Sequence, residues 1–168
     1  MQVPLFLQTI EESGISTWIR ESPSPFAFWG VLSVHAIGMS LLVGASVVID
    51  LRLLGFVPDL PLAPLKRFYR FIWVGFWMQV ASGLLLLIAY PTKALTNPDF
   101  YLKLTLIGLA VMIMQMLKNR VFSDQSLSEA AMMSKGKAFA RWSLILWVGA
   151  VTAGRMLAYT YTYLTYPG

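Results

Sequence analysis

The sequence predicts an all-α integral membrane protein, folded as a four-helix up-down bundle with an N-terminal amphipathic surface helix. Of its 168 residues, 57% are hydrophobic and only 12% are charged, whereas soluble domains average about 25% charged residues. Apolar residues fill whole segments instead of recurring as one stripe of a helix, which indicates a membrane solvent. Connections containing proline or basic residues separate these segments.

Residues 1–25 form the first predicted unit, an interfacial helix. Apolar residues between Leu5 and Ile19 alternate with polar ones, and Gly14 is expected to interrupt the helix. The segment is too short and too polar to span a bilayer, so we expect it to lie at the membrane surface. The run Ser22-Pro23-Ser24-Pro25 ends it.

Residues 26–168 form the second predicted unit, a transmembrane bundle with spans at about 26–49, 69–90, 100–117 and 139–164. At about 1.5 Å per residue these lengths suit a hydrocarbon core of about 30 Å. Short connections favour antiparallel neighbours. In the linker 118–138, Ser126 and Glu129 have capping-box spacing, which predicts a short surface helix near 127–134 that Gly136 would stop.

The basic residues predict the orientation. Nine of them lie in or beside the two odd-numbered connections and four lie on the other side. By the positive-inside rule, both termini are periplasmic in a bacterial inner (cytoplasmic) membrane. The net charge of +5 therefore does not indicate nucleic acid as a partner. The two groups are Arg52, Lys66, Arg67, Arg70, Lys118, Arg120, Lys135, Lys137 and Arg141, and then Arg20, Lys93, Lys103 and Arg155.

Several kinds of chemistry leave no sign in the sequence. The absence of cysteine excludes disulfides, iron–sulfur clusters and c-type haem attachment. We find no metal-ligand cluster, nucleophile elbow or phosphate loop, and no acidic residue inside the four predicted spans. This argues against a stand-alone enzyme for polar substrates and against a carboxylate-driven transporter. No catalytic residue is predicted, and whether the chain is an enzyme stays open.

His35 is the one histidine of the chain and lies in the first span, about 13 Å below its outer edge. An ionisable group at such depth is a functional hypothesis by default. We consider three interpretations: an axial ligand to the iron of a b-type haem, a hydrogen-bond donor to a quinone carbonyl, or a structural histidine bonded to a carbonyl or to Gln79. A second axial ligand could come from Met78 or Met156 on other helices, but not from Met39 on the same helix face.

Arg155 is the second candidate. It lies 14 residues beyond Arg141, or about 21 Å along a helix axis. Arg155 either snorkels to the outer interface or pairs with an anion inside the bundle, such as a haem propionate, a quinone or a lipid headgroup. The predicted cofactor-binding residues are therefore His35, Arg155, Gln79 and Met78, with His35 as the ligand of haem iron.

Two further patterns predict packing. Small residues four apart allow close approach of helix backbones, although the same gaps suit a flat cofactor ring. Asp50, at the inner end of the first span, is expected to pair with a group such as Arg70 on a neighbouring helix. The small-residue pairs are Ser40 with Gly44, Gly149 with Ala153, and Ala150 with Gly154.

Three segments carry a resemblance: HAIGMSLLVGASVVIDLRLLG at 35–55, SGLLLLIAY at 82–90 and NPDFYLKLTLIGLA at 97–110. Over about residues 16–118 the chain resembles a bacterial inner-membrane family of four-helix proteins of unknown function. It is more distantly similar to small four-helix membrane proteins of haem metabolism and copper resistance, some of which bind b-type haem through helix histidines. Members of the family often carry a further histidine just past the third span, where this chain reads MLKNRVF. The matching residues are His35, Gly38, Gly44, Asp50, Arg52, Gly55, Gly83, Asn97, Pro98, Phe100 and Lys103.

Together these features predict a small membrane subunit or anchor of a larger complex, such as a redox or photosynthetic one. Its expected partners are the lipid bilayer and other membrane protein subunits. The alternative is a b-type cytochrome or quinone-reactive electron carrier that uses His35 and Arg155, with haem b or a quinone as cofactor. A small transporter is a third interpretation.

Overall fold

The computed structural model describes residues 4–124 and 126–165, with the side chains of 161–165 left aside, and every regular element in this part of the chain is helical. Four helices are long and apolar enough to span a membrane, as predicted: Phe28–Leu54, Leu62–Ala89, Pro98–Phe122 and Glu129–Thr160. The predicted bundle extends to residue 168, but residues 166–168 lie outside the described residues. The elements are α1 (Leu5–Glu11), α2 (Gly14–Glu21), α3 (Phe28–Leu54), α4 (Leu62–Leu65), α5 (Phe68–Ala89), α6 (Pro91–Leu95), α7 (Pro98–Leu117), η1 (Lys118–Phe122) and α8 (Glu129–Thr165).

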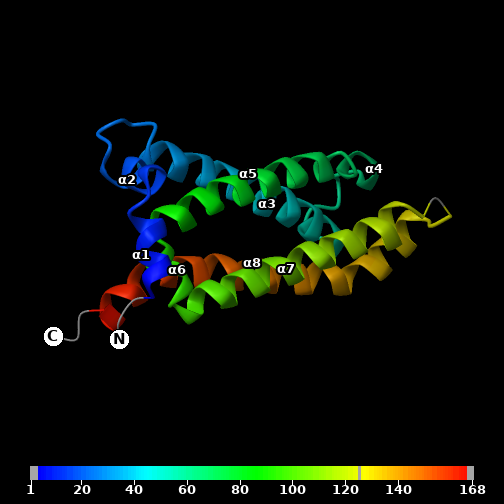
Figure 1. The fold of residues 1–168 in the computed structure, drawn as a ribbon. Coiled ribbons are helices and arrows are strands. Elements are labelled where there is room, and N and C mark those ends of the chain that lie inside the picture. Colours follow the sequence, from blue (N-terminus) through cyan, green and yellow to red (C-terminus); the bar gives the residue numbers. More distant parts are fainter. Residues whose placement is uncertain (1–3, 125, 166–168) are drawn as a thin grey trace.

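The long helices pack as two pairs (Figure 1). Helix α3 lies along α5, and α7 lies along α8. Helix α3 also packs on α8 and so joins the pairs, whereas α5 and α7 have little direct contact. The short helices α1 and α6 lie together at one end of the molecule, and α4 lies at the other (Figure 1).

The α3–α5 pair is held at a close crossing of two glycines. A Cβ added to Gly75 would lie 2.6 Å from Leu42 N and 2.7 Å from Gly38 O, and one added to Gly38 would lie 2.9 Å from Met78 Cβ. The backbones therefore touch here because neither residue has a side chain. The predicted packing role of Gly44 is wrong, since a Cβ there would meet nothing within 4 Å.

Two residues of the segments that carry the resemblance, Gly55 and Asn97, have structural roles at helix ends. Gly55 ends α3 with φ +94°, a left-handed conformation that glycine adopts without strain. Asn97 begins α7: its Oδ1 accepts a hydrogen bond from Asp99 N at 2.9 Å, and its Nδ2 donates to Thr160 Oγ1 at 2.9 Å. The Asn-Pro-Asp sequence thus starts α7 and ties it to the far end of α8.

The region 127–138 differs from its prediction. Residues from Glu129 onward belong to α8, and Gly136 does not stop the helix. A Cβ at Gly136 would lie 2.8 Å from Leu53 Cδ2, so this glycine serves the close packing of α8 on α3. Ser126 is not the cap either, because its hydroxyl bonds Asp124 Oδ1 at 2.5 Å, while Ser128 Oγ accepts from Ala131 N at 3.3 Å.

The end of the bundle near α4 is closely packed around Arg52, which is only 4% exposed. Its guanidinium pairs with Glu129 Oε1 at 2.5 Å, and its Nε donates to the carbonyl of Leu60. Arg52 therefore joins the end of α3 to the following loop and to the first turn of α8. Around it lies a core of fully buried apolar side chains: Ile49, Leu53, Leu65, Leu117, Val121 and Ala140.

Residues 4–25 fold onto the opposite end as two short helices. Ser16 Oγ donates to Ala89 O at 3.3 Å, and Thr92 Oγ1 donates to Glu11 Oε2 at 2.7 Å. Arg20 pairs with the same Glu11 at 3.2 Å, and Leu7 is buried at 2% exposure. The N-terminal segment is thus attached to the junction of α5 and α6 by specific contacts.

Candidate functional site

A large cavity of about 810 Å³ lies between the four long helices. It occupies the half of the molecule toward α6, where α5 and α7 stand apart. Its volume is within the range of about 300–1,000 Å³ typical of cofactor and small-molecule sites. No acidic residue lines it in the described part of the chain. The walls are mostly apolar, and their polar or ionisable side chains are those of His35, Gln79, Tyr90, Lys93 and Lys103.

His35 lines this cavity from α3 and is oriented by α5. Its Nδ1 lies 2.9 Å from Ser82 Oγ, and Ser82 Oγ in turn donates to Met78 O at 2.5 Å. The serine has one proton, which is used on the carbonyl, so its oxygen accepts from His35 Nδ1–H. This assigns the tautomer with the lone pair on Nε2. Among the described residues, Nε2 has no hydrogen-bond partner.

Gln79 and Met78, both predicted as site residues, are placed differently. Gln79 lines the cavity three residues before Ser82, and its buried Oε1 has no hydrogen-bond partner among the described groups. Met78 does not line the cavity; its Cβ lies against Gly38 at the helix crossing. Met156 is 47% exposed and also does not line the cavity. Met39, on the same helix as His35, is the one methionine in the described cavity wall.

Lys103 reaches the cavity from α7, opposite the α3–α5 wall. Its side chain lies along α8 at Gly154, where an added Cβ would lie 3.3 Å from Lys103 Cε and 3.6 Å from Nζ. No acidic side chain pairs with Lys103 in the part of the chain that the structure describes. Lys103 is one of the four outer basic residues in the predicted orientation, but its place within an apolar run and its presence in the resembling segment were signals of a different role.

Arg155 is not brought to the cavity. It is exposed on α8, and its guanidinium lies over the Tyr159 ring at 5.6 Å from the centroid. The neighbouring Gly154 lines the cavity, and the next residue along a helix points about 100° away. Arg155, predicted to bind a cofactor together with His35, therefore lies away from the cavity that His35 lines, whereas Lys103 lines it.

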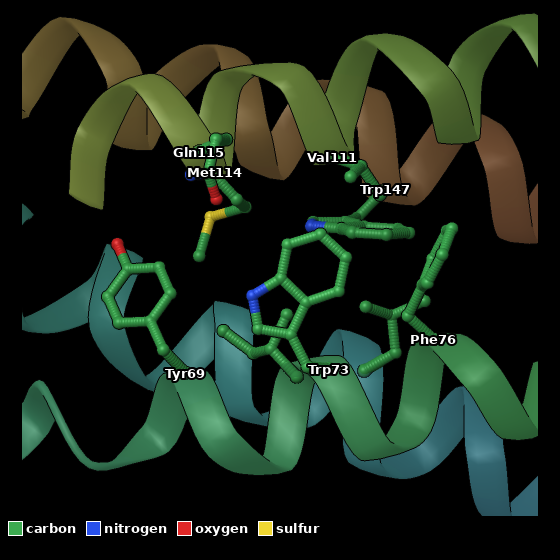
Figure 2. Close-up of a pocket in the computed structure, with 9 residues that line it drawn as sticks. Tyr69, Trp73, Phe76, Val111, Met114, Gln115 and Trp147 are labelled. Atoms are coloured by element: carbon green, nitrogen blue, oxygen red, sulfur yellow. The ribbon is translucent and has the colours of Figure 1, made fainter. Parts of the chain in front are cut away.

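An aromatic layer forms the floor of the large cavity. Phe76 and Trp147 line both the large cavity and a second one of about 10 Å³ on the other side. Figure 2 shows Trp73 rising from α5 between Tyr69 and Phe76, facing Trp147 and Met114 on the opposite helices. Such a small space holds about one water molecule. The layer thus separates the cavity from the other half of the bundle.

Asp50 lies beyond this layer and is fully buried, with 0% exposure. Neither carboxyl oxygen has a hydrogen-bond partner in the described structure, and the predicted ion pair with Arg70 is not formed. The hydroxyl of the buried Ser143 on α8 donates to Met114 Sδ at 3.4 Å. The predicted first span ends at residue 49 and so placed Asp50 at its inner boundary, but α3 continues to Leu54 and buries Asp50 among its last residues.

Comparisons with known proteins add no relative. No family model matches the chain, and the searches of curated proteins and of solved structures found no match. No group of three or more His, Cys, Asp or Glu side chains in the described part could hold a metal ion by itself. The functional argument therefore rests on the cavity and on the residues that line it.

Proposed function

We propose that this chain is a small multi-pass membrane protein that binds a flat amphipathic cofactor of the b-type haem class in the cavity. The observation that carries the proposal is His35 in the wall of a mostly apolar cavity of about 810 Å³, with Nδ1 bonded to Ser82 and, in the assigned tautomer, a lone pair on Nε2. Histidines that bind metals commonly donate their other ring N–H to a second group, which fixes the tautomer. Ser82 is that group here.

The residues of the cavity fit this cofactor. His35 would supply a nitrogen ligand to the iron, the apolar walls would cover the macrocycle, and Lys103 would face its carboxylates. A bound b-type haem supplies a one-electron redox centre. The aromatic layer of Trp73, Phe76 and Trp147 would limit water access from the other half of the bundle.

A quinone fits less well. In the assigned tautomer His35 Nε2 carries no proton and cannot donate to a quinone carbonyl. On that wall, the amide of Gln79 would then be left to donate a hydrogen bond to the quinone carbonyl. We therefore favour haem over a quinone-reactive site.

Difference absorption spectroscopy tests the proposal. The protein is purified in mild detergent, and spectra are recorded oxidised and dithionite-reduced, with and without added haemin. Wild type is expected to show a Soret band, which His35→Ala loses and added imidazole restores. Since no histidine or methionine faces His35 from another helix in the described cavity wall, the spectrum is expected to be of the high-spin, singly ligated type. A Soret band unchanged in His35→Ala would refute the proposal.

Ser82→Ala refines this test and has a matched control. It removes the acceptor of His35 Nδ1–H, so we expect haem affinity to fall by about ten- to a hundredfold. Ser40 makes the same kind of bond, Oγ to Ala36 O at 2.9 Å, but lies on an exposed face of α3. Ser40→Ala should therefore leave the spectrum and the affinity unchanged.

Membership of a larger membrane complex remains part of the proposal. Large apolar side chains on the outer faces suit lipid or the spans of other subunits; Trp77 is 63%, Val148 67% and Ile145 59% exposed. Mass spectrometry of the same mild preparation tests this interpretation, since a stable subunit would carry stoichiometric partner chains.

The proposed orientation places the cavity half toward the periplasm of a bacterial inner membrane, with both termini on that side. The asymmetry of nine against four basic residues supports it. Apolar side chains of α1 and α2 remain exposed, with Leu5 at 81%, Ile15 at 60% and Trp18 at 51%. These side chains suit insertion into the interface, as proposed for an amphipathic N-terminal segment.

A further inference from the structure

We propose that Lys103 binds the anionic group of the cavity's occupant, and that the occupant is a carboxylate-bearing amphiphile. The inference rests on the proposed function, because it assigns the ligand class of the same cavity. It starts from the charge of Lys103: the described wall of the cavity includes no acidic residue, and no acidic side chain in the described part of the chain pairs with Lys103. An ionisable side chain inside a membrane span is costly and is normally paired.

The position of Lys103 argues against an interpretation in which its side chain only snorkels to the membrane interface. It lies in the second turn of α7, and its stem is accommodated by the missing side chain of Gly154 on α8. A lysine that only needed water could extend along lipid without such a contact. Here the ammonium is kept at the cavity, across from the wall that carries His35 and Gln79.

The surroundings of Lys103 define the ligand. An ammonium group binds a carboxylate with charge-assisted hydrogen bonds, while the rest of the cavity offers mainly apolar surface. The occupant should therefore combine a carboxylate with an apolar body. A porphyrin with propionates and a long-chain fatty acid share this chemistry, and they can be separated by experiment.

The experiment compares haemin with its dimethyl ester, and then tests cis-parinaric acid, a fluorescent fatty acid. Absorbance and fluorescence titrations give the Kd of each probe for wild type, Lys103→Gln and Lys103→Arg. We expect wild type to bind haemin about ten- to a hundredfold more tightly than the ester. Lys103→Gln should reduce this preference to within about twofold, because removing either charge breaks the same interaction. Lys103→Arg, which keeps the charge, should retain most of the preference.

The matched control is Arg155→Gln, which removes a basic residue of α8 that lies outside the cavity. It should leave the preference for haemin unchanged. Gel filtration and thermal melting identify any variant that fails to fold, and Lys103→Arg keeps the test valid if Lys103→Gln is one of them.

The outcomes separate the two proposals. If neither porphyrin binds but cis-parinaric acid binds in a Lys103-dependent way, the haem proposal fails and the carboxylate inference stands. If His35-dependent haem binding occurs but the ester binds as tightly as the acid, the role of Lys103 is refuted and the haem proposal stands. Absence of binding by all three probes would overturn both.

Discussion

The contact of Gly38 with Gly75 gives the sharpest prediction about how this fold is built. A Cβ in Gly75→Ala would lie 2.6 Å from Leu42 N and 2.7 Å from Gly38 O. Both are backbone atoms of α3 and cannot move by a side-chain rotation. To restore a distance of 3.4 Å, the helices must separate locally by about 0.8 Å. We expect this overpacking to reduce the free energy of unfolding by about 1–3 kcal/mol.

Gly44→Ala is the matched control, on the same helix α3. A Cβ there meets nothing within 4 Å, so only the helix propensity changes. Alanine is favoured over glycine in a helix by up to about 1 kcal/mol, so this variant should be neutral or slightly stabilised. The two substitutions are thus expected to have opposite signs. Circular dichroism during SDS titration of the detergent-purified protein measures both.

Gly75→Ala should also disturb the contact between Ser82 and His35 in the cavity wall. Ser82 lies on α5 beyond Gly75, and its contact with His35 on α3 is 2.9 Å long. A local separation of about 0.8 Å would lengthen this contact from 2.9 Å to about 3.7 Å, beyond the usual hydrogen-bond range of about 3.2 Å. Gly75→Ala is therefore expected to weaken haem binding as well as stability. If Gly75→Ala and Gly44→Ala unfold within 0.5 kcal/mol of each other, the close crossing is not the contact that holds α3 to α5.

Two further predictions concern the helix ends. Asp50→Asn replaces a buried carboxyl, whose oxygens have no partner in the described structure, by a neutral amide of the same shape. Because burying a charge costs more than burying a neutral polar group, the free energy of unfolding should rise by about 1 kcal/mol. Exposed Asp59→Asn is the control on the same SDS titration, and a clear loss of stability in Asp50→Asn alone would contradict this reasoning. Gly55→Ala places a side chain at φ +94° and should cost about 1–2 kcal/mol. Gly14→Ala is its control, since both sites have open space and only Gly55 has positive φ; equal melting temperatures would contradict the strain argument.

Membrane location and the four long helices could be predicted because they depend on composition and length alone. A run of about 20 apolar residues is recognised as a membrane span whatever packs against it. The predicted spans accordingly match α3, α5, α7 and most of α8. The sequence did not predict that α8 runs unbroken from Glu129 through Gly136, because a glycine there is typical of a helix end. Its contact with Leu53 of α3 can be seen only in the structure.

Which faces of the helices meet was much harder to predict. In the apolar spans every face looks alike, so the spacing of Ser40 and Gly44 predicted a packing role for Gly44, whereas Gly38 makes the contact with α5. For the same reason Arg155 was grouped with His35 as a cofactor-binding residue, although it is exposed on α8 and does not line the cavity. His35 itself was found because a single ionisable residue stands out by type alone, and Ser82 was missed because a helical serine is ordinary.

The small residues of α8 show how one sequence pattern serves two purposes. Gly149 packs on α7, where an added Cβ would lie 3.2 Å from Leu106 Cδ1. Ala150 and Gly154, one position further on, line the large cavity instead. Because adjacent residues on a helix point about 100° apart, two small-residue pairs offset by one position present one face to a neighbouring helix and another to the cavity. Helix α8 can therefore approach α7 closely while leaving room beside Lys103. The cavity thus follows from the placement of its smallest side chains, and His35 and Lys103 supply its chemistry from the surrounding helices.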